Sequence, residues 1–425
     1  MQVLIFLFPL LITGQNDNGV RESFSEAEYF FSRGDYAEAA YYYRELLQVF
    51  PDNSNFNFKA GQCYLNIAGS EVLAIPFLEK AVMNVVPRNK YKGKSFEEAD
   101  APLHAFFYLG NAYRINDQLA EALDTYNKFV NSPFYYGNYN IAIVENEIMS
   151  CERAKIIQDN PLDVIEERLA TSLNTTFPEI NPVVSPDENA IACIRKQQFY
   201  DALYISIKEQ GTWSEPVNMN PLIGSDGDLY PACFSQDNTE LYLIKKGPKN
   251  SDIYVTRYRG DAWTKAERIP GKVNTGADET SAWLSADGST LYFSSARRGG
   301  RGGLDIYYAV KNPEGDWINI RNAGKTVNSR FDEEFPCISA NDSILFFSSK
   351  GHFNMGGYDV FYSQRIAKGW GLPVNVGYPV NNTGDNAGYV IIKGSEIYYS
   401  RKNTSDGTGE DIFHMTVKKT LTDRL

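Results

Sequence analysis

Short runs of alternating apolar and polar residues recur from Leu173 almost to the end of the chain. In the clearest unit, residues 273–309, the runs 280–285 and 291–295 are joined by a Ser-x-Asp-Gly turn, a composition that predicts a β-hairpin. A third run follows a glycine-rich loop, and a fourth begins at Trp317. The unit therefore predicts four short antiparallel strands.

The unit occurs five times. Its opening apolar residue recurs in steps of 50, 50, 54 and 53 residues, at Leu173, Ile223, Val273, Val327 and Val380. Four of the five tryptophans hold one equivalent place, where each is predicted to open the fourth strand: Trp213, Trp263, Trp317 and Trp370. Only Trp283 lies elsewhere. Small sheets that cannot bury a face alone can stack around an axis, so residues 163–420 are predicted to form a five-bladed β-propeller.

The ends of this region predict how the propeller closes. The fifth unit has no tryptophan-led fourth strand, whereas residues 163–170 hold the register of a fourth strand ahead of the first unit. A propeller whose last blade is completed by the first segment has no open edge. We therefore expect Val164 to Leu169 to pair with the strand from Asp411 to Val417.

Residues 22–159 have the three-and-four apolar spacing of amphipathic helices. Three helix pairs place glycine, alanine and aromatic residues as in a tetratricopeptide repeat of about 34 residues. A further helix, 140–157, is expected to cap the repeats with an apolar face made of Ile141, Val144, Ile148 and Cys151. The fold class predicted is an N-terminal tetratricopeptide α-solenoid followed by a separate five-bladed β-propeller.

An insertion separates the second and third repeats. It carries a basic run and then an acidic one: Arg88, Lys90, Lys92, Lys94, Glu97, Glu98 and Asp100. Charge runs usually solvate a surface, so a solvated loop is expected, with a basic docking patch as the alternative.

The first helix of each repeat is expected to line a concave groove that holds a partner segment. The predicted groove residues are Phe24, Glu28, Phe31, Phe58, Gln62, Leu65, Phe107, Asn111 and Arg114. The alternative is that the phenylalanines pack between neighbouring helices, as large apolar residues commonly do.

Residues 1–14 contain an apolar run followed by Thr13-Gly14, which predicts a cleaved signal peptide. No other segment is long and apolar enough to span a membrane. The net charge is −12, and nucleic-acid binding, which needs clustered Lys and Arg, is not expected.

Little in the sequence indicates chemistry. The five cysteines have no C-x-x-C spacing, and the three histidines lie far apart in the chain. No metal, cofactor or catalytic residue is therefore expected.

Acidic residues precede the first predicted strand of successive units, and basic residues follow the second. Because these two strands are antiparallel, the start of the first lies beside the end of the second. The charged residues are expected to form a face of opposite charges, made of Asp228, Asp278, Glu279, Asp332, Glu333, Asp385, Arg195, Lys245, Arg297, Lys350 and Arg401. Such a face is either a set of salt bridges and strand caps or the mouth of a binding site.

The leader, the repeats, the I-x-x-C-x-x-A capping helix and the S-x-D-G, L-Y-F-S-S and D-I-Y motifs together resemble a family of periplasmic proteins of the Bacteroidota. In that family, tetratricopeptide repeats precede a TolB-like propeller, and well-known relatives serve type IX secretion and gliding. The resemblance implies a periplasmic protein whose partners are envelope proteins. It also implies an association with the outer membrane. Many relatives carry an OmpA-like domain that binds peptidoglycan; this sequence shows none, so peptidoglycan binding is not expected.

Two functions follow from these patterns. The first is a non-enzymatic scaffold that joins envelope proteins. The alternative is a five-bladed propeller glycoside hydrolase or glycan-binding protein, in which unlike carboxylates would sit in the central channel. Fold alone does not decide between these functions. The carboxylates recur at matching positions in several units, as framework residues would, and this recurrence favours the scaffold.

Overall fold

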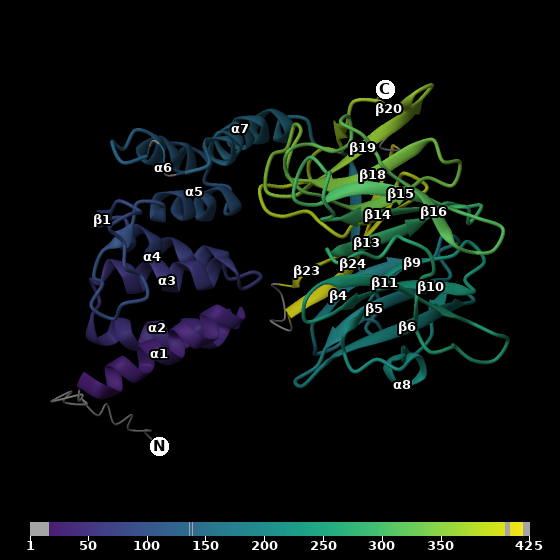
Figure 1. The fold of residues 1–425 in the computed structure, drawn as a ribbon, viewed down its shortest axis with the longest axis horizontal. Helices are drawn as coiled ribbons and strands as arrows, with labels where there is room; N and C mark the ends of the chain where they lie inside the picture. The colour runs from purple at the N-terminus through teal and green to yellow at the C-terminus, as the bar shows by residue number, and fades with distance from the viewer. Residues whose placement is uncertain (1–16, 136, 138, 404–408, 420–425) are drawn as a thin grey trace, which may run out of the picture. The chain divides into compact units, whose positions relative to one another are not determined.

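The computed structural model describes residues 17–135, 137, 139–403 and 409–419. The predicted signal peptide, residues 1–14, lies outside them. The chain forms two compact units, residues 1–148 and 149–425 (Figure 1). No helix among the described residues is both long and apolar enough to cross a lipid bilayer.

The N-terminal part of the chain consists of antiparallel helix pairs. Its elements are α1 (Asp17–Arg33), α2 (Tyr36–Val49), α3 (Ser54–Leu65), the 3-10 turn η1 (Glu71–Leu73), α4 (Ala74–Ala81), α5 (Ala105–Ile115), α6 (Leu119–Val130) and α7 (Ile141–Gln158). Glycine allows the helices to approach closely: a Cβ on Gly61 would lie 2.5 Å from Leu78, and one on Gly110 would lie 2.4 Å from Tyr126. The three predicted helix pairs are present.

The apolar face of α7 is only partly the predicted one. Val144 is buried and packs with Leu103, Phe129 and Tyr135, as a capping helix requires. Ile141, predicted on the same face, is 43% exposed, because it is the first residue of the helix.

The insertion between α4 and α5 folds back on the helices rather than projecting into solvent. Short parallel strands, β1 (Val85–Val86) and β2 (Ala101–Pro102), close its base. Within it, the Phe96 ring lies 5.8 Å from Phe24 and 6.1 Å from Phe56. The expectation of a merely solvated loop missed this aromatic anchor.

The C-terminal unit is a ring of five antiparallel sheets. The first three blades contain β4 (Glu179–Val184), β5 (Ala190–Lys196), β6 (Asp201–Glu209), β7 (Thr212–Trp213) and β8 (Val217–Asn218); β9 (Leu229–Phe234), β10 (Glu240–Lys246), β11 (Ser251–Arg257) and β12 (Glu267–Arg268); and β13 (Glu279–Leu284), β14 (Thr290–Ser295), β15 (Asp305–Lys311) and β16 (Trp317–Asn322). The last two contain β17 (Glu333–Ile338), β18 (Ile344–Ser349), β19 (Asp359–Ile366), β20 (Gly369–Trp370) and β21 (Val374–Asn375); and β22 (Val390–Ile392), β23 (Glu396–Asn403) and β24 (Gly409–Val417). A short helix, α8 (Asn220–Ile223), links the first two blades.

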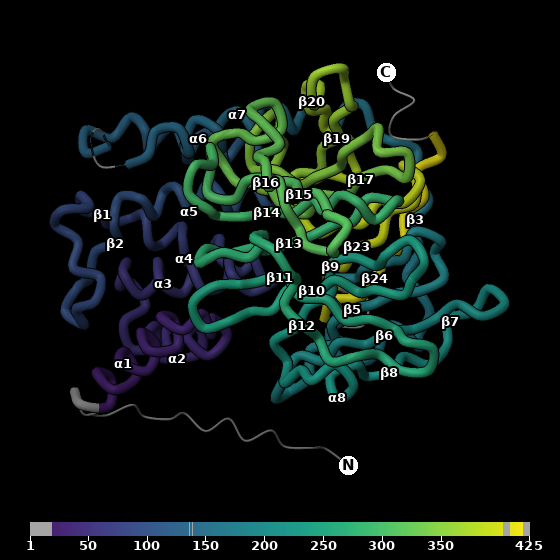
Figure 2. The backbone as a smooth tube through the Cα atoms, turned by 45° about the vertical axis from the view of Figure 1, so that its right-hand side comes forward, coloured from purple at the N-terminus to yellow at the C-terminus, as the bar shows by residue number. Residues whose placement is uncertain are grey.

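The predicted closure is confirmed. Strand β3 (Val164–Arg168) pairs antiparallel with β24, from Phe413↔Arg168 to Val417↔Val164, and completes the fifth blade. Figure 2 shows β3 beside the yellow C-terminal strands. Arg168 also pairs with the fully buried Asp411 at 2.6 Å, so a partly buried ion pair supports the backbone ladder.

The predicted outer strands are less regular. Trp317 opens a continuous strand, but Trp213 and Trp370 lie in two-residue ladders that end before the outer strand resumes. Pro216 and Pro373 follow in those two blades and cannot donate to a ladder, which explains the interruption there. Trp263 forms only an isolated bridge, a difference that no proline explains.

Candidate functional site

Buried glutamates begin three of the innermost strands. Glu279 and Glu333 were predicted at these positions, and Glu179 is their missed equivalent in the first blade. Each carboxylate accepts hydrogen bonds from the backbone N–H and the hydroxyl of a Thr or Ser four residues earlier, namely Thr175, Thr275 and Ser329. These glutamates therefore fix the loop that enters each blade.

The aspartates that precede the innermost strands join neighbouring blades. Asp278, Asp332 and Asp385 each accept a backbone N–H near the start of the third strand of the preceding blade. The donors, at 2.9, 3.0 and 2.8 Å respectively, are Ser251, Leu304 and Tyr358. An acceptor at each of these positions satisfies a strand end that would otherwise be unpaired.

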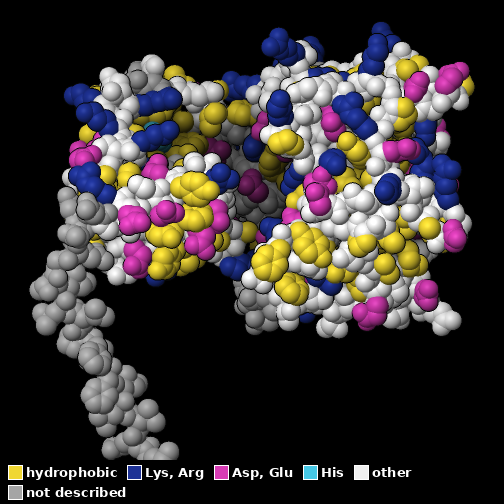
Figure 3. Space-filling view, turned by 60° about the horizontal axis from the view of Figure 1, so that its bottom comes forward, with side chains coloured by type: hydrophobic (Ala, Val, Ile, Leu, Met, Phe, Trp, Pro, Cys, Tyr) yellow, Lys and Arg dark blue, Asp and Glu magenta, His cyan; other side chains and the backbone are white. Residues whose placement is uncertain are grey.

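The five predicted cations all have acidic partners. The pairs are Arg195–Glu179 at 2.7 Å, Arg297–Glu279 at 3.2 Å, Lys245–Asp228 at 3.0 Å, Lys350–Asp332 at 3.1 Å and Arg401–Glu166 at 2.6 Å. The face of opposite charges is thus made of ion pairs and strand caps. On the propeller face seen in Figure 3, basic and acidic side chains are likewise interspersed.

Glu333 differs electrostatically from its equivalents. Glu179 and Glu279 each have an arginine partner, whereas the basic group beside Glu333 is the Nε2 atom of His352, at 4.0 Å. Burial raises the pKa of Glu333 to about 7, and burial also lowers the pKa of His352.

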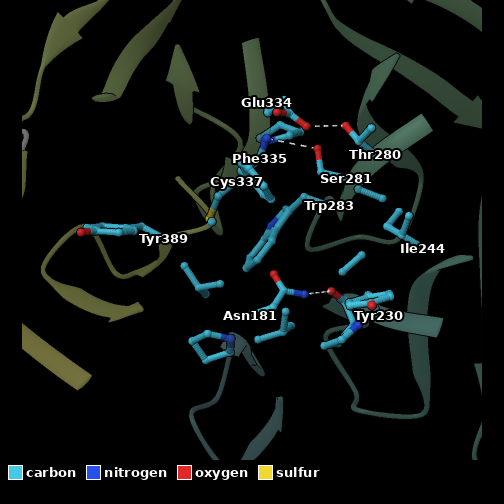
Figure 4. Close-up of a pocket in the computed structure, with 18 of the residues that line it drawn as sticks. Asn181, Tyr230, Ile244, Thr280, Ser281, Trp283, Glu334, Phe335, Cys337 and Tyr389 are labelled. Atoms are coloured by element: carbon cyan, nitrogen blue, oxygen red, sulfur yellow. Dashed lines mark hydrogen bonds between the residues drawn. The ribbon is translucent and has the colours of Figure 1, made fainter. Parts of the chain in front are cut away.

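A cavity of about 330 Å³ occupies the centre of the propeller, lined by residues of all five innermost strands (Figure 4). Its walls are largely apolar and aromatic. Trp283 projects into it, with Phe335 and Tyr389 also on the wall. Such a cavity, with a few polar groups among apolar walls, has the general character of a ligand site.

One carboxylate lines this cavity, and the sequence reasoning missed it. Glu334 occupies a position held in the other blades by Ile180, Tyr230, Thr280 and Ala387. Its two carboxylate oxygens accept hydrogen bonds from the Thr280 hydroxyl and the Tyr358 hydroxyl, each at 2.6 Å. The sequence signal for Glu334 was its difference from the uncharged residues at the equivalent position of the other blades. This difference was easily overlooked, because Glu334 directly follows two other acidic residues, Asp332 and Glu333.

The predicted groove of the helical unit contains core residues. Phe24, Phe58 and Arg114 are buried, and Arg114 pairs with Glu147 at 2.9 Å. Glu28 pairs with Lys59 at 2.9 Å. The packing alternative therefore describes Phe24 and Phe58, whereas Phe31, Gln62, Leu65 and Asn111 are partly exposed.

Phe107, one of the predicted groove residues, lines a pocket in the helical unit. This pocket measures about 280 Å³ and also includes Arg88, His104, Tyr139 and Ile143. Burial lowers the pKa of His104 to about 4, so the imidazole is neutral near pH 7. The pocket is therefore aromatic, with Arg88 as its charged group.

Among the described residues, no group of three or more His, Cys, Asp or Glu side chains is arranged so that it could hold a metal ion. The five cysteines are buried and form no disulfide. The candidate site is the cavity at the centre of the propeller, built from side chains of its innermost strands.

Residues 24–88 match the tetratricopeptide repeat family, which confirms the predicted repeats there. No relative with a curated function matches the sequence. Among solved structures, the chain is similar to TolB from Acinetobacter baumannii (18% identity, 59% of this chain and 57% of that chain, TM-score 0.38) and to a putative TolB from Agrobacterium tumefaciens (16%, 60% and 98%, TM-score 0.30). It is also similar to an α-L-arabinofuranosidase from Lactobacillus brevis (11%, 57% and 92%, TM-score 0.40).

The chain thus spans 57% of the length of the Acinetobacter protein. At these identities the likenesses concern the fold, and the five-bladed architecture follows from the strand pairing of this chain itself.

Proposed function

We propose that this chain is a non-enzymatic protein-interaction scaffold of the bacterial cell envelope. More specifically, we propose that it is a periplasmic protein that serves type IX secretion or a related outer-membrane assembly in the Bacteroidota. The observation that carries the proposal is the union of tetratricopeptide repeats, matched over residues 24–88, with a closed propeller. Helical repeats of this kind present extended surfaces to polypeptide segments.

The carboxylates support a scaffold over a glycoside hydrolase. Hydrolysis by the usual route needs two carboxylates about 5–10 Å apart that flank the scissile bond. Among the described residues that line the propeller cavity, Glu334 is the one carboxylate. The other acidic residues of that face are engaged in strand caps and ion pairs.

The aromatic pocket of the helical unit is the place to test partner binding. A photo-crosslinking amino acid at Ile143, which is 40% exposed and lines the pocket, should capture a discrete envelope protein in cells that make this chain. The same substitution at Lys128, an exposed residue of α6 outside the pocket lining, is the matched control.

Crosslinks of equal yield at both positions, or none at Ile143, would contradict a partner site in this pocket. Release of the protein by osmotic shock is expected for a periplasmic location, and retention with cytoplasmic proteins would contradict it.

A further inference from the structure

The cavity at the centre of the propeller is the strongest unassigned feature of the molecule, because two of its residues break the repeat that builds it. Glu334 stands where the other blades have uncharged residues, and Trp283 stands where they have Val183, Cys233, Cys337 and Val390. Framework residues recur from blade to blade, as the glutamates at strand starts do. Departures that converge on one cavity point instead to recognition.

Glu334 makes no ion pair within the described part of the chain. Lys350, a cation of the same blade, pairs with Asp332 instead. The two hydroxyl donors, Thr280 and Tyr358, hold the Glu334 carboxylate in place, and each oxygen retains a further lone pair. A partly buried carboxylate favours a positive partner, since charges removed from water are stabilised by pairing.

The same cavity already holds one cation against an aromatic face. The Nζ atom of Lys246 lies 3.6 Å from the centroid of the Tyr230 ring, and both residues line the cavity. Trp283 and Phe335 line the same cavity as Glu334, and no Lys or Arg of the described residues lies over either ring. Tryptophan gives the strongest cation–π attraction of the protein side chains.

Phe335 is held in an unfavourable backbone conformation. Its φ of +52° lies in the left-handed region, which costs a phenylalanine free energy, yet its N–H is fixed by the Ser281 hydroxyl at 3.1 Å. The equivalent residues of the first and fifth blades, Asn181 and Gly388, also have positive φ and are residue types suited to it. The aromatic ring is therefore kept on the cavity wall against local backbone preference.

The volume limits the ligand. At about 330 Å³ the cavity is at the low end of the range for small-molecule sites, which is about 300–1,000 Å³. It has room for one compact group, whereas an oligosaccharide needs a longer cleft.

We propose that this cavity binds a single guanidinium or primary ammonium group, with Glu334 as its counter-ion and Trp283 and Phe335 as its aromatic walls. The group comes either from a free amine or from an Arg or Lys side chain inserted by a partner polypeptide. This site goes beyond the scaffold function and does not depend on the pocket of the helical unit.

The test is calorimetric titration of the full chain with three probes: agmatine, a glycine-flanked peptide with one arginine, and the same peptide with neutral citrulline instead. The expected result is binding of agmatine, of the arginine peptide or of both; where the arginine peptide binds, the citrulline peptide should bind at least about tenfold more weakly. Agmatine binding identifies a free amine as a sufficient source; binding of the arginine peptide alone assigns the site to a partner side chain.

Glu334→Gln should weaken the binding of every cationic probe at least about tenfold, because the amide keeps the shape but loses the charge. The matched control is Asp226→Asn, which makes the same change in net charge at an exposed residue outside the cavity lining and should alter binding by less than about twofold. If Glu334→Gln fails to fold, Trp283→Leu should weaken cation binding through the lost aromatic face.

The proposal would be overturned if both peptides bound with equal affinity, if Glu334→Gln bound the cationic probes as tightly as the wild type, if no cationic probe bound, or if only neutral saccharides bound.

Discussion

Ionisation of Glu333 works against the fold, and this leads to a quantitative prediction. Its carboxyl group is fully buried and accepts hydrogen bonds from Ser329 N–H at 2.8 Å and from the Ser349 hydroxyl at 2.7 Å. Burial outweighs these bonds and raises the pKa from 4.5 to about 7. The folded protein therefore holds a proton that the unfolded chain has released between those two pH values.

The sign follows from this proton balance. Where the native state binds more protons than the unfolded state, the free energy of unfolding falls as pH rises. One pKa unit corresponds to about 1.4 kcal/mol, so the rise to about 7 corresponds to a loss of about 3 kcal/mol across the window from 4.5 to 7. Stability from this group is greatest below the window and is lost by its upper end.

Glu333→Gln should remove this dependence, since the amide resembles the protonated acid and cannot ionise. Urea unfolding followed by tryptophan fluorescence reports on the propeller, where all five tryptophans lie. The advantage of the variant over the wild type in unfolding free energy should grow by about 2.5 kcal/mol between about pH 5 and about pH 8.

Glu279→Gln is the matched control, because it removes a carboxylate that pairs with Arg297. It should destabilise the protein at about pH 8, since it leaves a partly buried arginine without its counter-ion. The reasoning is refuted if wild type and Glu333→Gln show the same pH dependence.

Three further predictions concern the framework. Deletion of residues 163–170 should lower the melting temperature of the propeller in a calorimetric scan, because β24 would become an open edge; an unchanged temperature would show that the closing strand is dispensable. Gly110→Ala should destabilise the helical unit by roughly 1–3 kcal/mol, measured by circular dichroism, because its Cβ would lie 2.4 Å from Tyr126; an unaffected unit would show that the helices separate at little cost. Asp278→Asn should abolish no enzymatic activity, since the side chain caps a strand; loss of a measurable glycan turnover in a folded variant would contradict the scaffold proposal.

The repeat phase made the propeller predictable from sequence. Steps of about 50 residues revealed five blades, and the same register assigned residues 163–170 to the closing strand. Regular spacing reports backbone geometry, because each sheet must bury its faces against its neighbours. It says less about where a ladder breaks, so the short strands around Trp213 and Trp370 were not anticipated.

Side-chain surroundings were harder to predict than strands. Helix periodicity placed Phe24, Phe58 and Arg114 on a presumed groove, but neighbouring elements cover them: Phe96 of the insertion packs on Phe24, and Glu147 pairs with Arg114. These contacts join residues far apart in sequence, and a periodic pattern within one helix contains no information about them.

The same limit explains why the face of opposite charges was predicted from the sequence and the central cavity was not. Residues such as Asp278 and Glu279 recur because every blade needs a capped strand and an anchored loop, and recurrence is what a repeat alignment detects. A ligand inside a propeller is not five-fold symmetric, so its contacts require residues that occur once. Glu334 on the fourth blade and Trp283 on the third meet that condition, which makes departures from the repeat the positions where binding is to be sought in a chain of this kind.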